Sequence, residues 1–103
     1  MAHTKIIAYK EDEIQIAKIA KAFGHPARLA ILRHLIETNE CCCSEIVKSL
    51  PIAQATVSQH LKILKEAGLI EGVISPPKVC YCINWQYWAK SKSLLEKFMT
   101  LSH

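Results

Sequence analysis

Hydrogen-bonding side chains are concentrated in a short segment whose apolar residues have the spacing of a helix. They carry amide, hydroxyl or imidazole groups and belong to Gln54, Thr56, Ser58, Gln59 and His60. Glutamine can pair bidentately with adenine, serine and threonine can reach base edges or phosphates, and the threonine methyl can touch the thymine methyl. A merely solvated face would more often carry Glu and Lys. The segment therefore favours readout of DNA bases, and a polar face without a partner is the alternative.

Three further residues complete the set that we expect at DNA. Ala55 and Lys62 lie on the same predicted helical face as Gln59. Lys78 lies beside the turn of a predicted hairpin, where it can reach a phosphate or the minor groove. Contacts of Lys62 and Lys78 with phosphates would strengthen binding to all sequences alike, because phosphates carry no sequence information.

Five cysteines form a second group with possible chemistry. They occur as a run, Cys41, Cys42 and Cys43, and as a spaced pair, Cys80 and Cys82. Thiolates select soft or borderline ions such as Zn(II), Cu(I) and the trivalent metalloids. The odd number of cysteines and the lack of an export signal argue for reduced thiols rather than a disulfide framework. All five are candidate ligands of a thiophilic metal or metalloid, or sites of oxidation.

The two groups of cysteines differ in geometry. Successive helical residues turn by about 100°, so at most two of three consecutive cysteines can face one ion. Cys43 shares a helical face with Ile46 and Val47, and burial as a small packed residue is its alternative role. Cys80 and Cys82 point to one face of a strand with Cα atoms about 6.6 Å apart, which suits chelation better than a disulfide.

Residues 44–67 are predicted to form a short helix, a turn and a longer helix that would position the polar segment. The first helix ends before Pro51, because proline lacks an N–H and disfavours a helical residue before it. The second helix carries an apolar stripe and ends near Gly68, which suits a C-terminal cap. A helix of about a dozen residues is roughly 18 Å long, enough to lie in a major groove.

A helix that begins at His25-Pro26 precedes this motif. Its buried stripe is expected to consist of Leu29, Leu32, Leu35 and Ile36. Arg28 and Arg33 lie off that stripe, so we expect both to be solvated, with phosphate contact as the alternative.

The flanking segments supply two amphipathic helices, 11–23 and 85–101, and a β-hairpin over 70–83 that is rich in Val, Ile and Tyr. A small domain with apolar helices at both ends is expected to pair them across a two-fold axis. The chain is therefore expected to form a homodimer.

Several motifs follow one another in order along residues 15–85. They are Phe23–Leu32, Glu45-Ile46, Leu50, Ala53–Leu61, Leu64 and Ala67–Ile70. This set resembles the ArsR/SmtB family of bacterial winged helix-turn-helix repressors, many of which respond to metals. The resemblance implies one winged helix-turn-helix domain over 1–103, mostly α with a β-hairpin wing and about five helices.

The resemblance also implies partners. In that family the first and last helices form the dimer interface, which here gives this role to 11–23 and 85–101. Two reading helices of a dimer face half-sites about one helical turn apart. The expected partner is double-stranded DNA with a palindromic operator.

The metal sites of the family match this sequence incompletely. Arsenic-sensing members carry Cys-x-Cys just before an acidic position, and counting back from Glu45 gives Cys42 and Ser44, of which only the first is a thiol. Cys41 and Cys43 have the right spacing one residue earlier. The zinc site on the last helix of other members is missing, because the last predicted helix contains no His, Asp or Cys.

The composition indicates a globular domain. Hydrophobic residues make up 50% and charged residues 21%, which excludes disorder, and no apolar run approaches the 18 or so residues of a membrane span. Thirteen Lys and Arg against nine Asp and Glu give a net charge of +4, which suits nucleic acid. The apolar run Ile6-Ile7-Ala8 is too short for a signal peptide, so we expect a cytoplasmic location.

These features predict a sequence-specific DNA-binding transcriptional regulator, a repressor released by a thiol-reactive metal, metalloid or oxidant. A DNA-binding regulator with no metal ligand and a winged-helix protein-interaction module are the alternatives. An enzyme is not expected, because the sequence has no Cys-x-x-Cys, no Ser or Cys with suitably spaced His and Asp, and no Gly-rich phosphate loop.

Overall fold

The computed structural model describes residues 8–39, 53–75 and 78–102. Its elements, in chain order, are α2 (Glu11–Phe23), α3 (Pro26–Thr38), α5 (Gln54–Glu66), β1 (Ile70–Ser75), β2 (Lys78–Ile83) and α6 (Trp85–Met99). The described residues thus contain four helices and one antiparallel pair of strands, which confirms the predicted class, mostly helical with a β-hairpin. The short helix expected before Pro51 lies outside the described residues.

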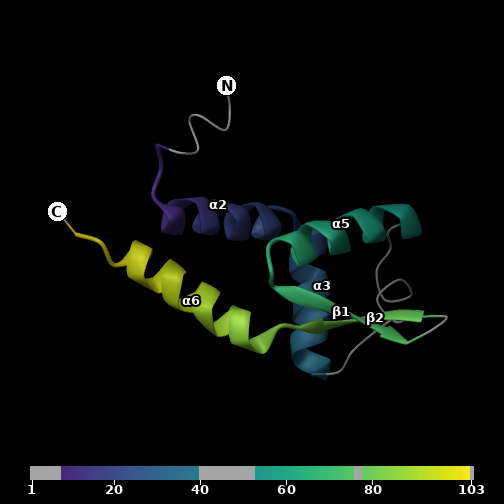
Figure 1. Ribbon diagram of the computed structural model, residues 1–103. Coiled ribbons are helices and arrows are strands. Elements are labelled where there is room, and N and C mark those ends of the chain that lie inside the picture. The colour runs from purple at the N-terminus through teal and green to yellow at the C-terminus, as the bar shows by residue number, and fades with distance from the viewer. Residues whose placement is uncertain (1–7, 40–52, 76–77, 103) are drawn as a thin grey trace.

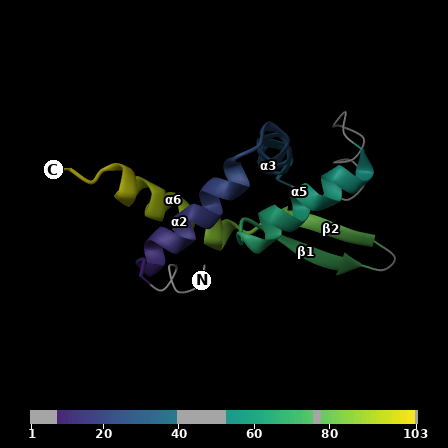
Figure 2. The same ribbon diagram turned by 90° about the horizontal axis from the view of Figure 1, so that it is seen from above.

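Helix α3 lies at the centre of the fold. It packs against α2, α5 and β2, while α5 also contacts β1 and α2 contacts α6. Figure 1 shows α2 and α6 extending to one side of α3, with α5 and the hairpin on the other side. In the view from above, α2 crosses α6 (Figure 2). The two terminal helices therefore form one end of the molecule, and α5 and the hairpin form the other.

The residues that flank each helix explain where it begins. Three consecutive acidic residues, 11–13, open α2 beside the positive end of its dipole. Pro26 is the first residue of α3, as predicted, and Nδ1 of His25 accepts a hydrogen bond from the Ala27 N–H at 3.0 Å. No helix in the described part of the chain is long and apolar enough to cross a membrane.

One hydrophobic core joins α3, α5, the hairpin and the end of α2. Its buried members are Ala22, Ile31, Leu32, Leu35, Val57, Leu61, Leu64, Ala67, Leu69, Ile70 and Ile83. Burial of Leu32 and Leu35 agrees with the predicted stripe of α3, but Leu29 is 48% exposed and Arg28 only 9% exposed. The predictions for Leu29 and Arg28 are therefore wrong. Helix α3 is rotated so that Arg28 faces inward, where backbone carbonyls of α2 accept hydrogen bonds from its guanidinium group.

A glycine with a left-handed backbone conformation lies between α5 and the hairpin. Gly68 has φ of 83°, a conformation that side chains with a Cβ rarely adopt. The Leu69 N–H then donates to the Leu64 carbonyl at 3.2 Å and closes the end of the helix. In the hairpin, Ile70 lies opposite Ile83, and both are buried against the core.

Candidate nucleic-acid interface

Helix α5 has one buried and one exposed face. Val57, Leu61 and Leu64 are buried, as their spacing predicts. Ser58 and Gln59 are exposed. Because the exposed face carries a hydroxyl and an amide, it can donate and accept hydrogen bonds beyond the protein.

The predicted DNA-contacting residues lie on α5 and on the hairpin. Ala55, Ser58, Gln59 and Lys62 are exposed on α5, and Thr56 is half-buried at the edge of the same face. Gln54 is the first residue of α5, and Lys78 is the first residue of β2, opposite Ser75 at the end of the hairpin. The structure thus brings four of the predicted residues together on one open helical surface.

His60 differs from its prediction as a DNA contact. Its side chain is 7% exposed and lies on the buried side of α5. Nδ1 of His60 is 3.1 Å from Nη1 of Arg28. A guanidinium group can only donate, so Nδ1 is the acceptor and the imidazole is neutral, with its proton on Nε2. His60 therefore anchors the helix and does not face solvent.

Arg28 ties three helices together. Its Nε donates to the Ala22 carbonyl at 2.9 Å, and its Nη2 donates to the Lys21 carbonyl at 2.8 Å. These carbonyls belong to the last turn of α2, where a positive charge also complements the helix dipole. With the hydrogen bond to His60, the α3 side chain connects the end of α2 to the middle of α5.

The environment of His60 favours its neutral form. Burial lowers the pKa of His60 below its ordinary value, and the nearby charges of His25 and Arg28 lower it further. The rings of His25 and His60 lie with centroids 4.6 Å apart. Sequence periodicity could have suggested this position, because His60 stands three residues after Val57 and directly before Leu61 on the apolar side.

The first turn of α5 lacks negative charge. Its first turn contains no acidic residue, and Ala53 at the N-cap offers no side-chain hydrogen bond. By contrast, the first turn of α2 has three acidic residues. Within its own first turn, α5 therefore carries no negative side chain that would repel a phosphate from the positive end of its dipole.

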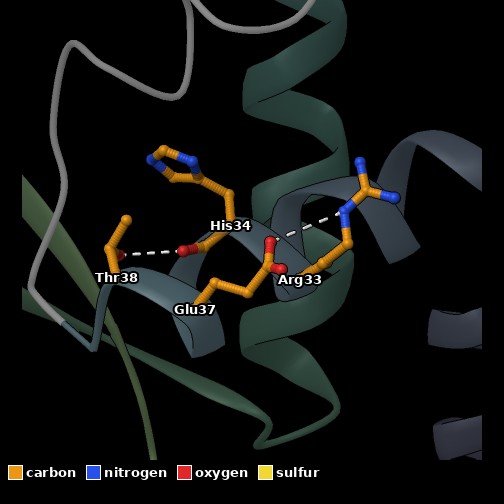
Figure 3. A network of polar contacts seen from close by, with 4 residues as sticks. All are labelled: Arg33, His34, Glu37 and Thr38. Carbon is orange, nitrogen blue, oxygen red and sulfur yellow. Dashed lines mark hydrogen bonds and ion pairs between the residues drawn. The ribbon is translucent and has the colours of Figure 1, made fainter.

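Arg33 lies on the exposed side of α3, as expected. Its Nε is 3.9 Å from Oε1 of Glu37, and the two side chains are 73% and 70% exposed. Figure 3 shows this ion pair beside the hydrogen bond from Oγ1 of Thr38 to the His34 carbonyl. An exposed pair of this kind contributes little to stability.

The cysteines of the wing differ from their prediction. Cys80 and Cys82 are half-buried on β2, opposite Val73 and Glu71, and both are disulfide-bonded. The prediction of reduced thiols at these two positions is therefore wrong, because strand spacing alone does not show which sulfur atoms the fold brings within bonding distance. A sulfur atom in a disulfide has no thiolate to offer a metal.

No described part of the chain gathers three or more His, Cys, Asp or Glu side chains around a potential metal position. The other predicted ligands, Cys41, Cys42 and Cys43, lie outside the described residues. Their role as metal or metalloid ligands stays a prediction.

The sequence is similar to bacterial and archaeal regulators. Residues 25–72 match the family described as "Bacterial regulatory protein, arsR family". An uncharacterized HTH-type transcriptional regulator of Methanocaldococcus jannaschii is 47% identical over 55 residues, which are 53% of this chain and 62% of that protein. The HTH-type transcriptional repressor SmtB of Mycobacterium tuberculosis is 42% identical over 64 residues, which are 62% of this chain and 47% of that protein. The chain thus spans less than two thirds of the length of these relatives.

A similar fold occurs in a solved structure, that of an ArsR-like transcriptional regulator from Rhodococcus sp. RHA1. The two chains are 23% identical, and their superposition has a TM-score of 0.72 and covers 84% of this chain and 80% of the other. The match extends beyond residues 25–72 and so includes elements outside the helix-turn-helix segment.

Proposed function

This chain carries an ArsR-family helix-turn-helix domain over residues 25–72, and from that premise we propose that the protein is a sequence-specific DNA-binding transcriptional repressor. The observation that carries the proposal is the division of α5 into an anchored face and an open polar face. His60 and the apolar stripe hold the helix to the core, while Ser58, Gln59 and Lys62 remain exposed.

In this proposal α5 enters the major groove of double-stranded DNA. Gln59 and Ser58 read base edges, with Gln54 and Thr56 contributing at the start of the helix, and Lys62 contacts a phosphate. The first turn of α5, which has no acidic residue, supports this orientation, because the helix dipole attracts a phosphate. At the wing, Lys78 contacts the backbone or the minor groove.

Binding to DNA from upstream of the protein's own coding sequence tests the proposal. We expect affinity to exceed that for a scrambled duplex, and log K to fall by about 0.9 per phosphate contact for each log unit of salt. Gln59→Ala is expected to lower the ratio of specific to non-specific affinity by about tenfold, whereas Lys62→Ala weakens both alike. Equal losses on both duplexes from Gln59→Ala would contradict its role as a base reader.

The proposed assembly is a homodimer on a palindromic operator. Helices α2 and α6 lie together at the end opposite the hairpin (Figure 1). Beyond them, α6 and the residues after it expose Phe98, Met99 and Leu101, whose side chains are 46%, 78% and 70% exposed. Burial of these apolar groups against a second copy is favourable, and a two-fold axis would present two copies of α5 to successive turns of DNA.

The proposed signal is thiol chemistry at the cysteines. Cys80 and Cys82, both disulfide-bonded, lie on β2 of the wing, which pairs with the strand that follows α5. We propose that the oxidised protein, or the reduced protein loaded with a thiophilic metal or metalloid at its cysteines, binds the operator more weakly. Each disulfide takes up two electrons and two protons from a dithiol and becomes two thiols, which restores binding.

Operator affinity measured before and after treatment with dithiothreitol tests this signal, with arsenite and Zn(II) added to the reduced protein. We expect reduction to tighten binding and either ion to weaken it. A variant with serine at all five cysteine positions serves as the redox-insensitive control. Operator affinity that is the same in all these states would exclude a role for the thiols without excluding DNA binding.

A winged-helix module that binds another protein is the second candidate, and a dimer without DNA affinity at low salt would favour it. The relatives are transcriptional regulators, so we propose no catalytic activity for this chain. A cytoplasmic location is part of the same proposal, because operator DNA is found there.

A further inference from the structure

One tyrosine of α6 contacts two other parts of the fold at once. Tyr87 is half-buried, and its hydroxyl group accepts a hydrogen bond from Nε2 of Gln15 on α2. Its ring lies against Gly68, where an added Cβ would be only 2.8 Å from Cδ2 and Cε2 of the ring. Gly68 is the point at which the chain passes from α5 to the hairpin. Tyr87 therefore joins both terminal helices to the end of α5.

The backbone around Tyr87 is bonded to the same junction. The Asn84 N–H donates to the Leu69 carbonyl at 3.0 Å, and Oδ1 of Asn84 accepts from the Tyr87 N–H at 3.1 Å. Asn84 is the N-cap of α6, so this hydrogen bond also fixes the first turn of that helix. The position of the Tyr87 ring on Gly68 is therefore set by hydrogen bonds as well as by packing.

Helix α5 is thus attached to the terminal helices at two points. Arg28 links the last turn of α2 to His60, in the middle of α5, and Tyr87 meets Gly68 just past its end. His60 and Gly68 are eight residues apart, which corresponds to about 12 Å along a helix. A helix held at one point can turn about that point, whereas two separated points fix its direction. The contact at Tyr87 therefore fixes the direction of α5 relative to α2 and α6.

In the proposed dimer, the direction of α5 determines which half-site spacing fits. Half-sites on successive turns of DNA lie about 34–36 Å apart, and each inserted base pair adds about 3.4 Å and about a tenth of a turn. A two-fold axis repeats any rotation of one α5 in the other protomer, so the change across the operator is doubled. Two helices of fixed direction should accept one spacing and reject spacings that are one base pair shorter or longer.

We infer that Tyr87 is a positioning residue that sets the half-site spacing selected by the proposed dimer. Its ring and its hydroxyl group hold the end of α5 at a fixed angle to the terminal helices, which supply the contact between the two copies. Tyr87 acts through α5 and does not itself read bases. The inference rests on the proposed function, because it needs two copies of α5 on one operator, but it concerns spacing and not base identity.

Four duplexes that share one half-site sequence test the inference with the full chain. They are the operator with its own spacing, the operator with one base pair removed or added between the half-sites, and a single half-site. We expect the wild-type protein to prefer its own spacing at least about tenfold. Tyr87→Phe keeps the ring and removes the acceptor, so it should lower this preference about threefold to tenfold and leave the affinity for the single half-site unchanged.

Two further variants show whether the hydrogen bond is responsible. Gln15→Met removes the donor and leaves Tyr87 intact, so it should lower the preference as much as Tyr87→Phe. The double variant should lose no more than either single variant, because both changes remove the same bond. Tyr81→Phe is the matched control, since Tyr81 is a half-buried tyrosine on β2, and it should retain the full preference.

The possible outcomes separate this inference from the proposed function. An undiminished preference in Tyr87→Phe and Gln15→Met would overturn the inference, as would an equal loss in Tyr81→Phe. Equal weakening on all four duplexes, or conversion of Tyr87→Phe to a monomer in sedimentation velocity, would also overturn it, because the residue would then support α5 or the dimer and not the spacing. A wild-type protein that binds no duplex selectively would instead contradict the proposed function.

Discussion

The hydrogen bond between Arg28 and His60 makes the position of helix α5 depend on the protonation state of one imidazole ring. Nδ1 of neutral His60 accepts from Nη1 of Arg28 at 3.1 Å. Protonation would replace this bond with two opposed donors and would place a second positive charge next to the guanidinium group. The buried cluster is therefore more stable while His60 is neutral.

We predict that acid weakens the folded state through His60. The pKa of His60 in the folded protein is lowered from 6.5, so the unfolded chain binds more protons between these two values. The contribution of His60 to the free energy of unfolding should be complete above about pH 6.5. It should decrease as the pH falls, by at most about 1.4 kcal/mol per pH unit for one proton. Urea unfolding measured at a series of pH values checks this.

Two variants separate the residues of this cluster. His60→Gln removes the titrating ring while leaving an oxygen that can accept from Arg28, so this pH dependence should largely disappear. His25→Asn retains a side chain that can cap α3 and should keep most of the dependence. If the dependence survives in His60→Gln and vanishes in His25→Asn, then His25 is the group responsible.

At Gly68, an added methyl group should lower the stability of the fold strongly. Its φ of 83° is unfavourable for other residues, and a Cβ would lie 2.8 Å from Cδ2 and Cε2 of Tyr87. We predict that Gly68→Ala lowers the free energy of unfolding by about 2 kcal/mol or more, because strain and overlap add. Gly24→Ala is the control. Gly24 has φ of −79°, so thermal unfolding should show a smaller loss for it.

The side chain of Arg28 donates hydrogen bonds to the last turn of α2 and to His60 of α5. These contacts hold α2, α3 and α5 in a fixed arrangement. Replacing the guanidinium group removes the Nε donor of the Ala22 carbonyl and one of two donors of the Lys21 carbonyl, which also accepts from the Gly24 N–H. We predict that Arg28→Met lowers the free energy of unfolding by about 2–4 kcal/mol, because hydrogen bonds from a buried charged group are lost. Chemical denaturation measures the change.

Arg33→Met on the same helix is the matched control for Arg28→Met. The Arg33 side chain is 73% exposed and its ion pair with Glu37 spans 3.9 Å, so its removal should change stability by less than about 0.5 kcal/mol. Similar losses in the two variants would show that Arg28 contributes no more than a surface arginine.

The link between α2 and α6 positions the end of the molecule opposite the hairpin. Nε2 of Gln15 donates to the hydroxyl group of Tyr87, whose ring also covers Gly68. Burial raises the pKa of Tyr87, so the phenol stays protonated at neutral pH. This side chain therefore connects the terminal helices with the residue that ends α5.

For the whole molecule, the proposed dimer predicts that affinity for the operator depends on apolar residues far from DNA. Phe98→Glu should raise the dimer dissociation constant at least about tenfold, because a carboxylate would be buried in the interface. Sedimentation velocity measures assembly, and operator binding should weaken in parallel.

Leu29→Glu is a suitable comparison for Phe98→Glu. Leu29 is 48% exposed and Phe98 46%, but Leu29 lies on α3 rather than on a terminal helix. The Leu29 variant should remain a dimer. A monomer produced by Leu29→Glu, or an unchanged dimer in Phe98→Glu, would contradict the proposed interface.

The sequence by itself determined the elements and the division of α5 into two faces. The spacing of Val57, Leu61 and Leu64 follows the 3.6-residue period, and the segments 70–75 and 78–83 are rich in Val, Ile and Tyr. Both signals depend only on neighbouring residues. The exposed positions of Ser58 and Gln59 could be predicted for the same reason.

Only the tertiary structure decided which side chains fill the space between elements. Arg28 and His60 are separated by 32 residues, yet they meet in the core. Leu29 is exposed because another side of α3 is covered by α2 and α5, and the disulfide bonding of Cys80 and Cys82 is likewise a feature that strand spacing did not predict. Local periodicity describes the faces of one helix or strand. The identity of the covering element is a property of contacts between distant parts of the chain.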